Sequence, residues 1–281
     1  MLVNIKMKHL EDSFTGVDNV KLYYQVWRPD DAPKAVVQVI HGYAEHSGRY
    51  MNVVNELVPR GYVIYAADHR GHGKSEGLQA YVEKFDIYVE DQKTFLDLIR
   101  EKEPNLPIFV LGHSMGAIIA RILAATYPDG IKGLVLSGAG TKVGGTNAFL
   151  KAIAKLLVLF APKKRIGIDL SEQISRDPEV VKAYQEDPLV FKKTTVRLGV
   201  ELLNGMKKAN KLTSQITIPT LVQSGSEDKG ILGAKDLEKL LTMPDKTIKI
   251  YEGLYHEVYN ELEEDRKKVL KDLGDWLDSH L

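Results

Sequence analysis

Short apolar segments alternate with helical patterns along most of the chain, and this alternation limits the fold more than any other feature of the sequence. The candidate buried strands are residues 35–40, 62–67, 107–112, 131–138, 217–225 and 246–253. Apolar residues with helical spacing occupy residues 48–60, 86–103, 117–128, 232–241 and 260–280. Strands that alternate with helices form a mostly parallel sheet covered by helices. The sequence therefore predicts an α/β fold, with an antiparallel start at the β-branched and aromatic segment 20–29.

The alternation is interrupted between residues 141 and 213. This segment contains several helical patterns and no stretch that is typical of a buried strand. A helical excursion packed against the sheet and a cap domain inserted after a strand are both compatible with it. Because the strand and helix patterns resume in order at Thr217, we favour the cap. We therefore expect an α/β core formed by residues 1–140 and 214–281, with a helical cap, or lid, at residues 141–213.

The stretch FVLGHSMGAII, residues 109–119, places Ser114 between a strand pattern and a helix pattern. A Gly-x-Ser-x-Gly string is modest support by itself. A nucleophilic serine needs this context, however, because a sharp strand-to-helix turn exposes its hydroxyl at the carboxyl edge of the sheet. Gly112 and Gly116 stand where a Cβ would crowd such a turn. The serine could instead serve only as the N-cap of the helix, but its context favours a nucleophile.

A serine nucleophile needs a histidine as base and a carboxylate that orients this histidine. In folds with such a turn the order is serine, acid, histidine, each just past a strand. The segment SGSEDKG offers Glu227 and Asp228 after one strand, and His256 follows the next strand. His280, the other downstream histidine, lies on a charged terminal helix. Asp228 could also cap a turn and His256 could be structural, but their joint placement favours catalysis.

Acyl transfer also requires N–H donors for the oxyanion. One donor is expected from the backbone of Met115, the residue after the nucleophile. The other is expected from the loop HGYAEHSGRY, residues 41–50. Its His-Gly pair lets the backbone pass close to the nucleophile, so the donor would be the backbone N–H of Tyr43. For His41 itself, support of the loop is favoured over proton transfer.

Composition excludes several other kinds of protein. The chain has no cysteine, which rules out disulfide scaffolds, cysteine-based zinc sites and thiol nucleophiles. Lys and Arg equal Asp and Glu, at 38 each, and no nucleic-acid motif is present, so we expect no nucleic-acid partner. The absence of cysteine fits a protein of the reducing cytoplasm, and equally an oxidation-avoiding protein of a thermophile. The N-terminal segment has no apolar core of signal-peptide length, and no stretch is long enough to span a bilayer.

The segment DHRGHGKSEG, residues 68–77, brings Asp68, His69 and His72 together in the sequence. Two histidines three residues apart, without a third ligand in place, are weak support for a metal site. A Gly-rich loop with a demanding backbone conformation and a hydrogen-bonded aspartate explains this composition better. We therefore expect neither a metal nor a cofactor.

Five segments, taken in order, resemble one known family. HGYAEHSGRY, DHRGHGKSEG, GHSMG, GSEDKG and YHEVYNE are similar to the monoacylglycerol lipase and lysophospholipase-like branch of the α/β-hydrolases. The resemblance covers nearly the whole chain outside the expected cap, and DPLV at 187–190 within the cap is also similar to that branch. It implies an α/β-hydrolase fold with an inserted cap and a serine carboxylester hydrolase activity.

The resemblance also implies roles for individual residues. Ser114 would be the nucleophile, His256 the base and acid, and Asp228 the orienting carboxylate. Tyr43 and Met115 would supply the oxyanion N–H groups.

In such lipases, polar residues of the His-Gly loop meet the glycerol end of a substrate, which implies contacts from Glu45 and Arg49, although both could also serve only to brace the loop. Tyr43 departs from the family, which commonly has a small residue at this position. The larger side chain would narrow or reshape the side of the pocket that takes the alcohol part of the substrate. Cap sequences diverge widely, so the preference for an acyl chain does not carry over.

The most apolar stretch, NAFLKAIAKLLVLFAP, covers residues 147–162 of the expected cap. A helix this apolar either buries itself on several sides or meets lipid. Plain packing against the core is one interpretation. The other is a lid that lines an acyl tunnel through Phe149, Ile153 and Leu157. Such a lid would also make transient contact with a lipid surface, aided by the basic segment at 163–165.

We expect a serine hydrolase that cleaves single-chain acyl esters, foremost monoacylglycerols, to fatty acid and glycerol. A lysophospholipase and a generic short- or medium-chain carboxylesterase are alternatives on the same machinery. A ligand-binding protein that does not hydrolyse is the alternative from another class. The expected partner is a small lipid ester, and the expected location is the cytoplasm with peripheral membrane contact. No feature of the sequence indicates an oligomeric state.

Overall fold

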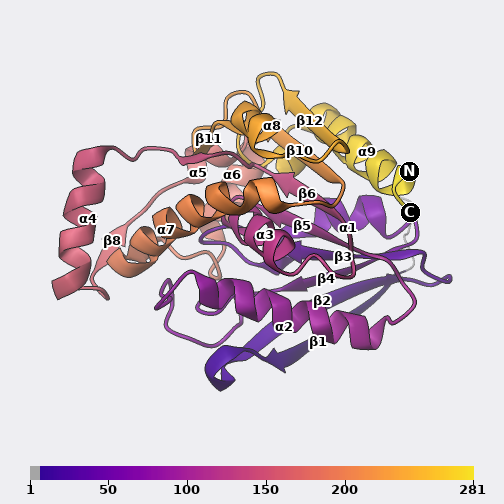
Figure 1. Cartoon of the computed structure of the whole chain (residues 1–281), viewed down its shortest axis with the longest axis horizontal. Coiled ribbons are helices and arrows are strands. Elements are labelled where there is room, and N and C mark those ends of the chain that lie inside the picture. The colour runs from indigo at the N-terminus through magenta and orange to yellow at the C-terminus, as the bar shows by residue number, and fades with distance from the viewer. Residues whose placement is uncertain (1–6) are drawn as a thin grey trace.

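The computed structural model describes residues 7–281, apart from the side chains of Phe149 and Lys151. Its centre is an eight-stranded sheet in the order β1-β2-β4-β3-β5-β6-β10-β12 (Figure 1). The strands are β1 (Met7–Thr15), β2 (Lys21–Pro29), β3 (Ala35–Ile40), β4 (Tyr62–Ala67), β5 (Ile108–His113), β6 (Ile131–Ser137), β10 (Thr220–Gly225) and β12 (Lys246–Tyr251). The pairs β1–β2 and β2–β4 are antiparallel, and the other neighbouring pairs are parallel. The predicted α/β fold with a mostly parallel sheet is confirmed.

Helices cover both faces of this sheet. The principal ones outside the β6–β10 connection are α1 (Met51–Leu57), α2 (Asp86–Lys102), α3 (Met115–Thr126) and α9 (Glu263–Ser279). Apolar side chains of α2 and α3 share a buried cluster with Val36 and Ile40 of β3. Those of α1 and α9 share another with Val37 and Val39 of the same strand. Successive residues of a strand face opposite layers, which explains why the parallel strands are almost wholly apolar.

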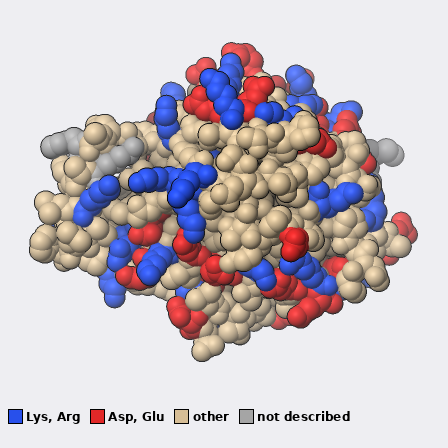
Figure 2. Space-filling model, in the orientation of Figure 1, with Lys and Arg blue, Asp and Glu red and all other residues tan. Residues whose placement is uncertain are grey.

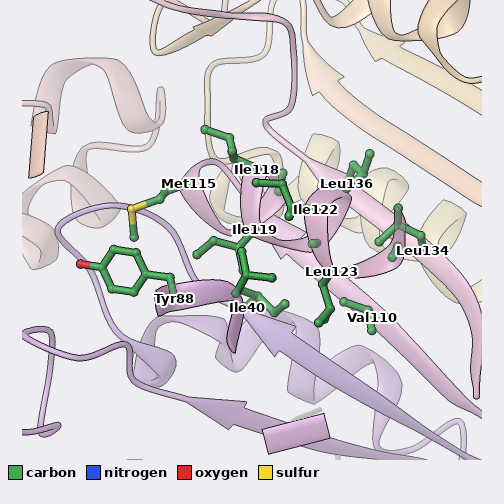
Figure 3. Packing of buried hydrophobic residues seen from close by; sticks show 14 of the residues in the cluster. Ile40, Tyr88, Val110, Met115, Ile118, Ile119, Ile122, Leu123, Leu134 and Leu136 are labelled. Carbon is green, nitrogen blue, oxygen red and sulfur yellow. The ribbon is translucent and has the colours of Figure 1, made fainter. Parts of the chain in front are cut away.

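Helix α3 is held firmly against the sheet. Every residue from Met115 to Ala124 is buried. Figure 3 shows members of its cluster, with Ile40, Val110, Leu134 and Leu136 from the strands and Ile118, Ile119, Ile122 and Leu123 from α3. Because close packing fixes the helix, the residue that precedes it also has a defined position.

The chain between β6 and β10 adds no strand to the main sheet in the part that the structure describes. Its elements are β7 (Lys142–Val143), α4 (Ala148–Phe160), β8 (Arg165–Gly167), α5 (Ser171–Ile174), α6 (Pro178–Glu186), β9 (Lys193–Thr195) and α7 (Val196–Leu212). Figure 1 shows α4 projecting at the left, far from the sheet, while α7 returns across α3. We call this connection the insert. The division into a core and a cap at residues 141–213 stays a prediction.

One local prediction differs from the structure, and one strand was not predicted. The helix expected at residues 232–241 is mostly wrong, because this segment contains the end of β11 (Ile231–Leu232), a 3-10 turn (Ala234–Asp236) and only a short α8 (Leu237–Leu240). Gly233 has a φ of +82° between these pieces, and β11 pairs with β7 of the insert. The sequence also gave little sign of β1, whose residues are mainly exposed, as is common for an edge strand. Short 3-10 turns at Val17–Asn19, Ser47–Tyr50, Thr213–Gln215 and Val258–Asn260 complete the fold.

Candidate active site

Ser114 occupies the sharp turn between β5 and α3. Its backbone has φ +54° and ψ −115°, a conformation that costs a residue with a side chain roughly 1–3 kcal/mol. A Cβ on Gly112 would lie 2.4 Å from the carbonyl oxygen of Gly116, and a Cβ on Gly116 would lie 1.9 Å from that of Ile40. Neither glycine can therefore carry a side chain, and the strained turn predicted from the sequence is present.

The hydroxyl of Ser114 faces a histidine and does not cap the helix. Ser114 stands at the N-cap position of α3, but its side chain makes no capping hydrogen bond. Its Oγ lies 2.8 Å from Nε2 of His256. The alternative of a merely capping serine thus has no support in the geometry.

Asp228 completes the row of side chains that we call the triad, with Ser114 and His256. Oδ2 of Asp228 lies 2.7 Å from Nδ1 of His256. Because a carboxylate accepts hydrogen bonds, Nδ1–H donates to Asp228 and Nε2 is left to accept from the serine hydroxyl. Oδ1 of Asp228 accepts from the backbone N–H groups of Gly230 and Ile231, at 2.8 and 3.0 Å. Asp228 therefore caps a turn, as the alternative interpretation held, and also orients the histidine.

The surroundings shift both titrating groups of the triad. Burial alone would raise the pKa of Asp228, but the nearby His256 and three hydrogen bonds outweigh it and lower the pKa. Burial would lower the pKa of His256, but the charge of Asp228 and the hydrogen bond to it outweigh this and raise the pKa above its ordinary 6.5. Each partner favours the charged form of the other.

The insert holds the loop that carries His256. The backbone N–H of His256 donates to the carbonyl of Gln173 at 3.4 Å, and that of Glu257 donates to the carbonyl of Ile174 at 2.7 Å. Both acceptors belong to α5. No pattern in the sequence pointed to these contacts, because they join segments that lie more than 80 residues apart.

The two expected oxyanion donors belong to segments that adjoin Ser114. A Cβ built on Gly42 would be 3.2 Å from Cβ of Ser114, so the loop of residues 41–50, the oxyanion loop, passes beside the serine. The N–H of Met115 begins α3, where a helix has no internal acceptor. Among the hydrogen bonds of the described residues, none uses the N–H of Tyr43. Both N–H groups are therefore available to a ligand.

His41 and its histidine neighbours support this loop. Nε2 of His41 accepts from the N–H of His69 at 2.9 Å, so Nδ1 carries the hydrogen and donates to the carbonyl of Gly42 at 2.8 Å. This bond pins the peptide whose other end is the N–H of Tyr43. Burial lowers the pKa of His69 to about 3 and that of His72 to about 4, so both rings are neutral at physiological pH.

Asp68 anchors the same loop from the other side. Its carboxylate accepts the backbone N–H of Ser47 at 2.7 Å and of Lys74 at 2.8 Å. Within the described part of the chain, no group of three or more His, Cys, Asp or Glu is arranged to hold a metal ion. The DHRGHG segment therefore provides a Gly-rich loop with a hydrogen-bonded aspartate.

Glu45 and Arg49 belong to a buried ion network with Glu257. Arg49 makes two hydrogen bonds to Glu257, at 2.7 and 2.8 Å, and one to Glu45 at 2.9 Å. Its guanidinium lies 4.7 Å from the ring centre of Tyr184 in the insert. Oε1 of Glu45 accepts the N–H of Gly42 at 2.6 Å. Glu45 and Glu257 reach the wall of the cavity beside Ser114, whereas Arg49 lies behind them and braces the loop.

A cavity of about 370 Å³ opens at Ser114 and His256. Its apolar wall includes Val143, Ile168, Leu170, Ile174, Leu202 and Leu203, all from the insert. The residues expected to line it from α4 do not do so where they are described. Ile153 and Leu157 are absent from the wall, and α4 projects away from the sheet (Figure 1). The side chain of Phe149 lies outside the described part of the chain. The wall comes from α7 and the segment around α5 instead.

The chain matches a known family over most of its length. The family model described as serine aminopeptidase, S33, matches residues 31–263. This span contains the triad, the oxyanion loop and the whole insert.

Individual relatives cover nearly the whole chain. A monoacylglycerol lipase of Mycolicibacterium smegmatis is 39% identical over 275 residues, which are 96% of this chain and 98% of the relative. A monoglyceride lipase of Homo sapiens is 36% identical over 267 residues, 93% of this chain and 88% of the relative. The crystal structure of Paleococcus ferrophilus monoacylglycerol lipase matches with a TM-score of 0.80 and 30% identity, over 98% of this chain and 100% of that chain. The resemblance found in the five sequence segments is confirmed.

Proposed function

We propose a function from the premise that the chain belongs to the serine hydrolase family described as serine aminopeptidase, S33. The chain is a serine carboxylester hydrolase that cleaves monoacylglycerols to fatty acid and glycerol. The relatives named monoacylglycerol lipase and monoglyceride lipase match it over 96% and 93% of its length. The observation that carries the proposal is the hydrogen-bonded triad, with 2.8 and 2.7 Å between its members, at the end of an apolar cavity.

In the proposed mechanism, His256 acts first as a base and then as an acid in each half-reaction. Ser114 attacks the ester carbonyl while Nε2 of His256 takes the hydroxyl proton. The oxyanion accepts hydrogen bonds from the N–H groups of Tyr43 and Met115. His256 then gives its proton to the leaving alcohol, and an acyl group stays on Ser114. His256 then takes a proton from a water molecule, which attacks the acyl-enzyme. As the bond to Oγ breaks and the fatty acid leaves, His256 returns this proton to Ser114. Asp228 stabilises the imidazolium in both steps.

The polar side of the cavity favours a neutral alcohol over a phosphodiester. Glu45, Glu257 and Gln173 line it beside the triad and offer partners for hydroxyl groups. The charge of Arg49 is used by Glu45 and Glu257. Lys229 is the one cation among the described lining residues, and its side chain is exposed. The phosphate of a lysophospholipid headgroup would therefore find no free buried cation to pair with, which argues for glycerol as the leaving alcohol.

Matched substrates test this choice. We expect kcat/KM for monooleoylglycerol to exceed that for oleoyl lysophosphatidylglycerol by about 10-fold or more, since placing a charge in a cavity without a partner costs free energy and 1.4 kcal/mol is tenfold. Fatty acid release from mixed micelles of each lipid gives both constants, and p-nitrophenyl butyrate reports the basal esterase.

Each other outcome selects an alternative. Equal or faster cleavage of the lysophospholipid would mean a lysophospholipase. Turnover of p-nitrophenyl butyrate alone would mean a generic carboxylesterase. Binding of fatty ligands without turnover of any ester would mean a ligand-binding protein on this fold.

We also propose that α4 makes transient contact with a lipid surface. Several of its large apolar side chains are strongly exposed, with Leu156 at 62%, Leu159 at 73% and Phe160 at 80%. Figure 2 shows the lobe at the left, where α4 lies, as mainly uncharged, with Lys and Arg toward the rest of the molecule. An exposed apolar patch rimmed by basic residues is typical of a lipid contact. None of the described helices is long and apolar enough to cross a membrane.

Vesicle binding tests the lipid contact. The double substitution Leu159→Ser and Phe160→Ser is expected to weaken binding to vesicles of phosphatidylcholine and phosphatidylglycerol by about 10-fold. Each of the two changes removes apolar surface that would be buried in the lipid on binding. Hydrolysis of soluble p-nitrophenyl butyrate should stay unchanged, since neither residue lines the cavity. The matched control is Leu10→Ser with Leu262→Ser, at 52% and 41% exposure on other surfaces. Equal loss of binding in the control would refute a role specific to α4. Cytoplasmic location with peripheral membrane contact also stays part of this proposal.

A further inference from the structure

One segment of the insert, residues 187–194, lies directly against the oxyanion loop. Its contacts fall on three residues of that loop, namely Tyr43, Ala44 and His46. None of these contacts involves the triad. The cavity wall includes Tyr43 but no residue of the segment 187–194.

The first contact fixes a strained backbone. Ala44 has a φ of +66°, in the left-handed region that residues with a Cβ rarely adopt. Its carbonyl oxygen accepts the backbone N–H of Phe191 at 3.2 Å. Strained conformations persist only where the surroundings over-determine them. The N–H of Phe191 therefore helps to hold the turn that follows Tyr43.

The second contact is a charge-assisted hydrogen bond. Nδ1 of His46 accepts the N–H of Gly48 at 3.2 Å, so the hydrogen of a neutral His46 is on Nε2. That Nε2–H donates to Oδ2 of Asp187 at 2.9 Å. Oδ1 of Asp187 accepts the N–H of Leu189 at 2.8 Å, so both oxygens of the carboxylate are engaged. Asp187 thereby links the end of α6 to the oxyanion loop.

The third contact involves Tyr43, the residue that departs from the family pattern. Its ring meets that of Phe191 edge to face, with 5.5 Å between ring centres. The ring of Phe191 also lies 4.9 Å from that of His72. A large aromatic at this position thus ties the donor residue itself to the insert, which a small residue could not do.

We infer that the segment 187–194 holds the N–H of Tyr43 in the place that the oxyanion needs, with Asp187 and Phe191 as positioning residues. The inference rests on the proposed function of the triad. Its consequence is that the insert sets the rate of the chemical step as well as the fit of the acyl chain. A displaced donor weakens transition-state binding and leaves ground-state binding unchanged, so kcat falls and KM does not.

Substitution of Asp187 tests the inference on p-nitrophenyl butyrate, a soluble ester with a short acyl chain. Asp187→Ala is expected to lower kcat by about 10- to 100-fold, with KM nearly unchanged. This fall in kcat should not exceed the one caused by removing an oxyanion donor altogether. Inhibition by an alkyl trifluoromethyl ketone, whose adduct with the serine carries an oxyanion, should weaken by a similar factor. Affinity for the product fatty acid should stay the same.

The matched control is Asp177→Ala. Asp177 stands at the other end of α6 and accepts the N–H of the residue two positions on, as Asp187 does, but makes no contact with the oxyanion loop. Asp187→Asn keeps an acceptor for His46 and should give a kcat between wild type and Asp187→Ala. Phe191→Leu, which keeps the backbone N–H, should also lower kcat, and it serves if Asp187→Ala does not fold.

The outcomes separate this inference from the proposed function. If the wild type hydrolyses no ester, the proposed function itself fails. If the wild type is active and Asp187→Ala loses no more kcat than Asp177→Ala, or changes KM alone, the positioning role is wrong.

Discussion

Ser114→Ala should lower kcat for monooleoylglycerol by about 10⁶-fold, the loss found when the nucleophile of a serine protease triad is removed. The hydroxyl lies 2.8 Å from Nε2 of His256. Ser114 has a strained backbone, with φ +54°, and its side chain makes no capping hydrogen bond. The residual rate would come from the oxyanion N–H groups and substrate binding alone. Glycerol release over hours, with freshly purified protein, gives this rate.

Ser226→Ala is the control for this substitution. Ser226 lies just after β10 and is exposed, and its hydroxyl accepts the N–H of Gly253 at 2.8 Å without reaching the cavity. Its activity should equal that of the wild type. Ester hydrolysis by Ser114→Ala at more than a small fraction of the wild-type rate would contradict the assignment of the nucleophile.

Asp228→Asn is expected to lower kcat by about 10³- to 10⁴-fold, because an amide can stabilise neither the correct tautomer nor the imidazolium. It should also shift the pH profile. The pKa of His256 is raised above 6.5 by Asp228, so wild-type kcat/KM should fall with decreasing pH around a midpoint above 6.5. Loss of the carboxylate lowers this pKa, and the acid limb moves to lower pH.

The profile of kcat/KM for p-nitrophenyl butyrate between about pH 5 and 9 measures both changes. A variant with an acid limb at the wild-type position would mean that Asp228 does not govern the ionisation of His256. Asp236→Asn, a change of the same kind on the surface turn before α8, should leave rate and limb unchanged.

Much of this site could be predicted because its members follow the ends of parallel strands. Ser114 follows β5, Asp228 follows β10 and His256 follows β12. Carboxyl ends of parallel strands meet at one edge of the sheet, so the order of the motifs implied their proximity. The sharp turn at Ser114 could be predicted from its flanking glycines, since the turn leaves no room for a Cβ at those positions.

The insert was less predictable because its contacts depend on tertiary packing. An apolar pattern shows that α4 is a helix but not where it points, and α4 projects while α7 lines the cavity. The backbone bonds from α5 to the His256 loop use carbonyl groups, which carry no sequence signal. Arg49 was expected at the substrate, but its side chain binds Glu45 and Glu257 and lies behind the cavity wall. Glu257 is 208 residues away in the sequence, so this contact could not be predicted.

The central claim is that Ser114 forms the covalent intermediate. An alkyl fluorophosphonate tests it most directly, because this reagent phosphonylates only a serine that an adjacent base activates. Mass spectrometry of the wild type is predicted to find one phosphonyl group, on the peptide that contains Ser114, and none on Ser114→Ala. An adduct on another residue, or an unmodified wild type that still hydrolyses esters, would contradict the account.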